Sequence, residues 1–159
     1  MKIHKTWPVL EWSEPASTVS FWKGVRCQAA LFFIGGGLYN LIEILWRGYT
    51  HWSMFLLGGL CFLLIGGIHT RLQKCSLFWR CTLCALTITA LEFLCGCLVN
   101  RVLHLGVWDY SAFPLNLLGQ VCLLYTVLWG LLSVIAGPIY RFFRALLEGR
   151  LHLKKPVQD

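Results

Sequence analysis

Charged side chains are scarce in this sequence. Asp, Glu, Lys and Arg make up only 13% of its 159 residues, whereas 57% of the residues are hydrophobic. A soluble domain usually contains about 25% charged residues, so this chain has too few polar side chains to cover a soluble core. The composition therefore excludes an ordinary soluble domain and indicates an integral membrane protein.

Several motifs that carry chemistry are also missing. The sequence has no GxxxxGKS or GxxxxGKT phosphate loop, so the chain cannot power transport by itself. It has no HxxxH, HxxE or paired DxxD spacing. Cys81 and Cys84 form a lone CxxC, which we interpret as small apolar residues packed between helices rather than a metal or redox centre. We therefore predict no catalytic residues, no metal and no cofactor.

Four long apolar runs are present instead, at residues 27–46, 52–68, 81–100 and 114–137. About 20 apolar residues cross the ~30 Å hydrocarbon layer of a bilayer. We therefore predict an all-α integral membrane protein with four transmembrane helices. Glycine pairs in the first two runs favour close helix packing.

The four runs also divide the chain. We predict a cytoplasmic arm at residues 1–22, a membrane domain at 23–138, and a cytoplasmic amphipathic helix and tail at 139–159. The arm contains no apolar block of the length that a cleavable signal peptide needs, so we expect the first membrane helix to direct insertion. Gly137-Pro138 marks an end or a kink of the fourth helix. Beyond it, apolar residues recur at helical spacing and arginines fill much of the opposite face, which is typical of a helix on a membrane surface.

The net charge of +7 is distributed unevenly. The segment before the first apolar run, residues 1–26, has four Lys or Arg residues, the loop at 69–80 has three and the C-terminal tail has five, whereas the two other connections have one each. By the positive-inside rule, both termini are cytoplasmic and the chain is a multi-pass protein of the cell membrane. The charge thus indicates the lipid bilayer as its partner and no nucleic acid.

Two short segments resemble each other, MFLLGGLC at residues 54–61 and LNLLGQVC at residues 115–122. Each follows a run that contains one embedded glutamate, Glu43 or Glu92. Two explanations stay open. The chain has a parallel 2+2 repeat about an axis along the membrane normal, or the two segments share only a bias toward Leu and Gly.

Polar residues within the apolar runs fall on shared helix faces. An embedded carboxylate costs ~2.5–3.5 kcal/mol on insertion scales, so such groups usually face the bundle interior and find partners. One hypothesis is a polar cleft between the four helices, open to the outside, with Glu92 as its floor and residues 108–111 as its cap. Its candidate ligand-binding residues are Tyr39, Glu43, Arg47, His51, Glu92, Asn100, His104, Trp108, Asp109, Tyr110, Asn116 and Gln120.

The alternative is that these groups only pair with one another. Glu43 would pair with Arg47 along a helix, because the two are four residues apart. Glu92 would pair with Asn116 or Gln120, which we expect one turn apart on the fourth helix. The segment Trp108–Ser111 leaves a similar choice: it could bind a cation or a head group, or form an Asx turn with aromatic anchors.

A pattern of polar, glycine and aromatic residues extends over residues 31–137. Its members are Tyr39, Glu43, Arg47-Gly48, Thr50-His51, Ser53-Met54-Phe55, Gly58-Gly59, Glu92, Gly96, Asn100, Val107-Trp108-Asp109-Tyr110-Ser111, Pro114, Asn116 and Gly119-Gln120. In these residues the chain resembles a known family, the ABC-transporter type IV, or CmpB-like, small integral membrane proteins. The family is mostly bacterial, and a distant branch includes small vertebrate transmembrane proteins of unknown function. The chain departs from the family pattern at Trp52 and Leu124, where we expect prolines, and it lacks an Asn-Glu pair near Ile68-His69.

The resemblance implies a permease-like transporter subunit. Four spans are few for a complete pathway, so transport would need an ATPase subunit, a homo-oligomer or both. Two other functions stay open. One is a membrane-embedded enzyme that acts on a lipid or isoprenoid, with Glu92, His104 and Asp109 as acid, base or metal candidates. The other is a scaffold that packs against larger membrane proteins through its glycine-rich faces.

Overall fold

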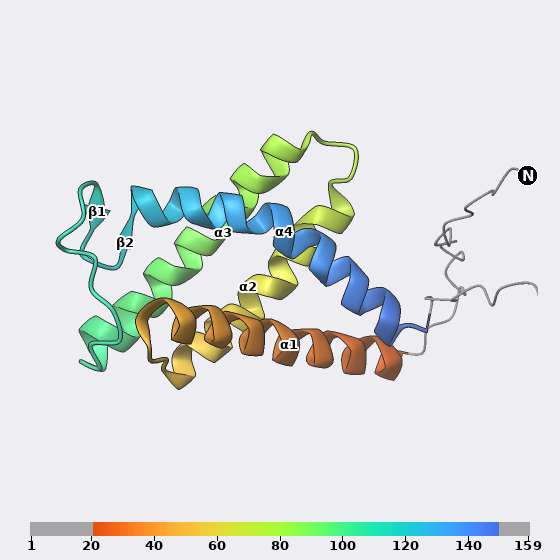
Figure 1. Cartoon of the computed structure of the whole chain (residues 1–159), viewed down its shortest axis with the longest axis horizontal. Coiled ribbons are helices and arrows are strands. Elements are labelled where there is room, and N and C mark those ends of the chain that lie inside the picture. The colour runs from red at the N-terminus through yellow and green to blue at the C-terminus, as the bar shows by residue number, and fades with distance from the viewer. Residues whose placement is uncertain (1–20, 150–159) are drawn as a thin grey trace, which may run out of the picture.

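The computed structural model describes residues 21–149 and contains four long helices and a small hairpin (Figure 1). Each long helix is long and apolar enough to cross a membrane, which confirms the predicted multi-pass helical architecture. The predicted arm at residues 1–22 lies almost wholly outside the described residues, and the tail from residue 150 does so entirely. The elements are α1 (Phe21–Arg47), α2 (Trp52–Arg71), α3 (Leu77–Gly96), the π-helical turn η1 (Cys97–Val102), β1 (Asn116–Leu117), β2 (Val121–Cys122) and α4 (Leu123–Leu147).

The molecule has two unlike ends. One end, here called the hairpin end, contains the turn between α1 and α2 and the hairpin segment, residues 103–122 (Figure 1). The start of α1 and the end of α4 lie together at the opposite end. The positive-inside prediction places the hairpin end outside the cell.

Helices α1 and α2 pack closely because glycines on each helix receive aromatic residues of the other. A Cβ on Gly36 would lie 2.7 Å from the Phe55 carbonyl oxygen, and a Cβ on Gly59 would lie 2.7 Å from the Phe32 carbonyl oxygen. Gly58 likewise receives the side chain of Tyr39. The glycine pairs therefore act as small-residue contacts, as predicted, and the contact with Gly58 fixes the position of Tyr39.

Helix α4 packs on α2 and α3 but hardly touches α1. Gly66 of α2 receives Tyr140, and Gly137 of α4 receives His69. Thr89 and Thr126 share a 2.9 Å hydrogen bond between α3 and α4. Because α4 is held by α2 and α3, a gap is left between α1 and α4, and this gap becomes the candidate site.

The predicted fourth span is wrong at its start. Residues 114–122 are not helical, and α4 begins only at Leu123. The side chain of Asn116 explains the difference: it donates to the Phe113 carbonyl at 2.8 Å and accepts from the Gly119 N–H at 3.0 Å. Leu115 and Leu118 both have positive φ, 52° and 54°, which a helix does not allow. Local hydrogen bonds to the backbone thus replace helical ones although the stretch is rich in leucine.

Helix α4 does not end at Gly137-Pro138 but continues to Leu147. The residues predicted to begin a separate amphipathic helix at 139 are instead the last turns of α4. The helix changes direction along its length (Figure 1), and Pro138 lies inside it. Proline has no N–H and its ring crowds the preceding turn, so it bends a helix without necessarily ending it.

The two similar segments have different conformations. Residues 54–61 belong to α2, whereas residues 115–122 form the antiparallel hairpin in which Asn116 pairs with Cys122 and Leu117 with Val121. The matching letters are therefore not a repeated structural unit. The structure therefore does not confirm the parallel 2+2 repeat.

Candidate functional site

Glu92 lies within α3 and is only 2% exposed. The Tyr110 hydroxyl of the hairpin segment donates to its Oε1 at 3.1 Å, and the Trp129 indole N–H of α4 donates to its Oε2 at 2.9 Å. Both donors are neutral, so Glu92 has no cationic partner among the described residues. The predicted pairing of Glu92 with Asn116 or Gln120 is therefore wrong.

Glu43 lies near the end of α1 and is 7% exposed. It forms an ion pair with Arg47 one turn later, as predicted, and accepts a hydrogen bond from the Thr50 hydroxyl. Arg47 also donates to the Val107 carbonyl at 3.0 Å, and its guanidinium lies 4.5 Å from the centroid of the Tyr49 ring. This set of contacts ties the end of α1 to the turn before α2 and to the hairpin segment.

The hairpin segment is held on η1 and the end of α3 by amide side chains. Asn100 donates to the Trp108 carbonyl at 3.0 Å and to Gln120 Oε1 at 2.8 Å, and it accepts from the Val107 N–H at 2.7 Å. The Trp108 indole donates to the Gln120 carbonyl at 2.9 Å. Gly96 makes room for this contact, because a Cβ there would lie 2.6 Å from Gln120 Oε1. Asn100, Trp108 and Gln120 thus position the segment.

Asp109 forms an Asx turn, one of the two alternatives left open for this segment. It accepts from the Ser111 backbone N–H at 2.8 Å and from the Ser111 hydroxyl at 2.9 Å, and it remains exposed. Asn116 forms the local bonds of the hairpin described above. Both carboxylate oxygens accept a hydrogen bond in this turn, and Asp109 also lines the larger cavity described next.

Two adjoining cavities lie between α1 and α4. The larger, the hairpin-end cavity, has a volume of about 590 Å³ and is bordered by the end of α1, the hairpin segment and α4. The smaller, the mid-helix cavity, has a volume of about 190 Å³ and lies deeper along α1, α2 and α4. We call the two together the α1–α4 groove, because they share the lining residues Tyr39, Ile42, Trp129, Leu132 and Ile135.

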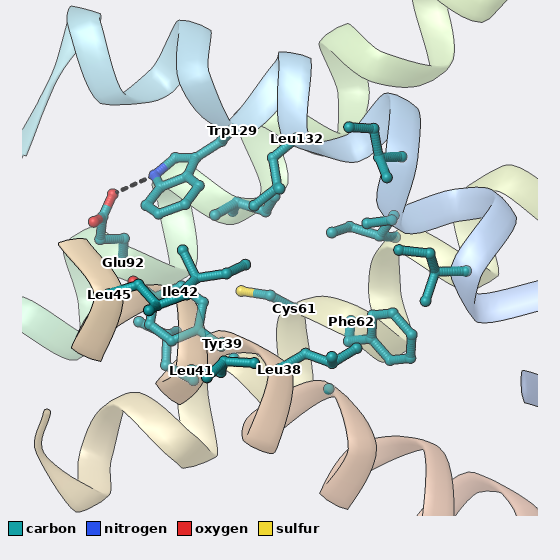
Figure 2. Close-up of a pocket in the computed structure, with 18 residues that line it drawn as sticks. Leu38, Tyr39, Leu41, Ile42, Leu45, Cys61, Phe62, Glu92, Trp129 and Leu132 are labelled. Carbon is teal, nitrogen blue, oxygen red and sulfur yellow. Dashed lines mark hydrogen bonds between the residues drawn. The ribbon is translucent and has the colours of Figure 1, made fainter.

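The mid-helix cavity is almost entirely apolar (Figure 2). Trp129 and Leu132 of α4 face Leu38 and Tyr39 of α1 across it, and Cys61 of α2 lies between them. Glu92 borders this cavity, with its carboxylate bound to Trp129. Cys61 belongs to the apolar core, as does Cys84, and the place of Cys84 agrees with the packing role predicted for it.

The structure distributes the twelve candidate residues between the groove and its supports. His51 caps α2 by accepting from the Ser53 N–H at 3.3 Å, and His104 is exposed with φ of 53°. In the described part of the chain, no three His, Cys, Asp or Glu residues gather as a metal site. Seven candidates line the groove, namely Tyr39, Glu43, Arg47, Glu92, Trp108, Asp109 and Tyr110, whereas His51, Asn100, His104, Asn116 and Gln120 do not.

Sequence reasoning missed the aromatic wall of the groove. Tyr125 and Trp129 of α4 line it, and Tyr125 stacks on Tyr110 with ring centroids 4.5 Å apart. Trp129 contacts both Tyr125 and Tyr39 at about 6 Å. The spacing of four residues between Tyr125 and Trp129 was a usable signal, since it places both rings on one helix face.

The charges around the hairpin-end cavity nearly cancel. Glu43 and Asp109 are negative and Arg47 is positive, so its lining carries a net charge of −1. Burial raises the pKa of the Tyr110 phenol far above its usual range, and the negative charge of Glu92 raises it further. Tyr110 therefore stays protonated and remains a hydrogen-bond donor to Glu92.

No solved structure was found that matches this chain. A family model described as "Putative ABC-transporter type IV" matches residues 30–154. The match covers most of the chain and includes all four long helices from residue 30 onward, the hairpin segment and every residue of the groove. This match agrees with the resemblance found in residues 31–137. We therefore conclude that the chain belongs to the ABC-transporter type IV (CmpB) family of membrane proteins.

Proposed function

We propose that the chain is a permease-like subunit that takes up a small amphiphilic ligand in the α1–α4 groove. The observation that carries the proposal is the groove itself. It combines an apolar cavity at mid-helix with a cavity bordered by Arg47, Glu43 and Asp109 at the hairpin end. Such a combination of an apolar lining with a few polar groups is typical of small-molecule sites.

Glu92 has the central place in this proposal. Its carboxylate borders the mid-helix cavity while Tyr110 and Trp129, which line the groove, bind it. Intramembrane carboxylates are costly and commonly mark a ligand or ion pathway. A ligand that enters between Tyr39 and Trp129 would therefore disturb the hydrogen bonds of Glu92. Ligand binding would in this way change the contact between α3 and α4.

An energy source must come from a partner, since the chain has no phosphate loop. The chain belongs to a family of ABC-transporter type, which supports an ATPase subunit as that partner. Self-association is compatible with the same role, because four spans are few for a complete pathway.

The test is purification of the chain with its partners from its native membrane in mild detergent, followed by an assay of ATP hydrolysis. We expect a stoichiometric ATPase subunit, and we expect Glu92→Gln to lower the hydrolysis rate by more than half while the chain inserts and expresses normally. Thr89→Val is the matched control, because it removes a different α3–α4 hydrogen bond outside the groove. A chain that copurifies with no ATPase, or a Glu92→Gln complex with the wild-type rate, would refute the proposal.

A further inference from the structure

The α1–α4 groove has the dimensions of one lipid leaflet. Its lining on α1 extends from Gly35 to Arg47, which at ~1.5 Å per residue covers roughly 18 Å of the helix. Half of the ~30 Å hydrocarbon layer is about 15 Å. The apolar part of the groove can therefore take an extended hydrocarbon chain from one leaflet.

The groove is open toward the side of the bundle. Helix α1 makes few contacts with α4, and residues at the edge of the groove are exposed, with Leu131 62% and Ile135 61% accessible. In a membrane these side chains face lipid. A hydrocarbon chain can enter between the two helices directly from the bilayer, without crossing a layer of water.

The hairpin end of the groove is suited to a head group that carries one positive and one negative charge. Eight of its seventeen lining residues are aromatic, and Asp109 lies among them. Aromatic faces and a carboxylate attract an ammonium group. Arg47 lines this end of the groove, and a phosphate is the acceptor that a guanidinium binds best. The net charge of −1 on the lining disfavours a purely anionic head group.

From these three observations we propose that the groove binds a zwitterionic phospholipid from the bilayer. Part of one acyl chain lies in the mid-helix cavity, the phosphate reaches Arg47 and the ammonium rests on the aromatic wall beside Asp109. This inference deepens the proposed function, on which it rests, by naming the class of its ligand. It makes the chain a lipid-handling subunit.

Photocrosslinking tests the inference directly. The full chain is reconstituted in nanodiscs of equal phosphatidylcholine and phosphatidylglycerol, with a trace of either lipid carrying a diazirine on its acyl chain, and labelled peptides are mapped by mass spectrometry. We expect the phosphatidylcholine probe to label the groove segments of α1 and α4 at least five-fold more than the phosphatidylglycerol probe. Equal labelling by the two probes, preference for the anionic probe, or no labelling of the groove segments would each overturn the inference.

Two pairs of variants locate the lipid. Ile135→Trp and Ile42→Trp fill the groove from opposite sides and should each lower labelling by about ten-fold. Their neighbours Val134→Trp and Ile44→Trp are the controls, since both are exposed but line neither cavity. Because all four sites are exposed, the bulky side chains do not disturb the core. Labelling that persists in both filled variants would overturn the inference.

A third pair tests the head group. Asp109→Asn should lower the ratio of phosphatidylcholine to phosphatidylglycerol labelling toward one. Ser111→Ala is the control, because it removes a hydrogen bond of the same turn without changing the charge. A preference that survives in Asp109→Asn contradicts the proposed ammonium position. These experiments do not depend on ATP hydrolysis. Specific lipid labelling without an ATPase partner would therefore refute the proposed function alone, and an ATPase effect without lipid selectivity would refute this inference alone.

Discussion

The two buried glutamates of the membrane region have opposite kinds of surroundings. Glu43 lies near a helix end and has a cation, Arg47, together with the Thr50 hydroxyl. Glu92 lies deeper in the bundle and has only neutral donors, Tyr110 and Trp129. A paired charge mainly holds structure, whereas a carboxyl group held by neutral donors has no counter-charge. Glu43 therefore has a structural role, whereas Glu92 is the group that can respond to a ligand.

The strongest test of this difference is to make the same substitution, Glu to Gln, at both positions. Glu43→Gln leaves Arg47 without its counter-charge, and we expect a loss of about 3 kcal/mol in the free energy of unfolding. Glu92→Gln should lose about 1 kcal/mol, because its amide oxygen can still accept from Trp129 and its NH₂ can donate to Tyr110. Unfolding in mixed micelles, followed by circular dichroism, measures both losses.

The double variant Glu43→Gln/Arg47→Gln is the control for charge. It removes both members of the pair and should recover part of the loss seen with Glu43→Gln alone. Equal losses for Glu43→Gln and Glu92→Gln would show that the two carboxylates do not differ as described.

A second test moves the hairpin segment away from Glu92 while the ion pair along α1 remains. A Cβ on Gly96 would lie 3.0 Å from the Trp108 ring and closer still to Gln120, so Gly96→Ala should destabilise the fold by about 2 kcal/mol. We also expect Cys122, which is 2% exposed in β2, to react faster with a maleimide. Gly67→Ala is the control, because a Cβ there meets nothing within 4 Å; similar behaviour of the two variants would count against a tightly docked hairpin.

The smallest effect concerns Tyr110, the neutral donor to Glu92. Its folded pKa lies above the unfolded value of about 10, so its contribution to stability is complete below pH ~10 and decreases as the pH rises beyond that value. Tyr110→Phe should cost about 1 kcal/mol at neutral pH, the value of one hydrogen bond. Alkaline titration at 295 nm should show no difference between wild type and Tyr110→Phe near pH 10, and an extra ionising tyrosine in the wild type at that pH would be the contrary result.

Sequence reasoning reached some of these features because they are local. The ion pair of Glu43 and Arg47 follows from their spacing on one helix, and the glycines between α1 and α2 follow from the general need for small residues where membrane helices meet. The number of helices follows from hydropathy alone. Each of these depends on a pattern contained within one element.

The features that were missed depend on contacts between distant elements or on local hydrogen bonds that override hydropathy. Residues 114–122 have the composition of a membrane helix, but Asn116 directs the backbone into a hairpin. Because the start of α4 was predicted at the wrong residue, the sequence could not show that the helix face with Tyr125 and Trp129 points toward Glu92. The partners of Glu92 follow from that placement, so no count of polar residues along the chain could have found them.

The contact between Arg47 and the Val107 carbonyl has a consequence for the order in which the protein folds. It joins residues 60 positions apart, so closing that loop costs more chain entropy than forming the contiguous α1–α2 pair, whose glycine contacts are local to two neighbouring helices. The α1–α2 pair can assemble as soon as both helices are inserted. The hairpin segment can settle only after α3 has arrived, and Trp129 can reach Glu92 only after α4 has followed. The groove is thus the last part of the molecule to exist, and a chain interrupted during synthesis before α4 would present Glu92 to the lipid without its Trp129 partner.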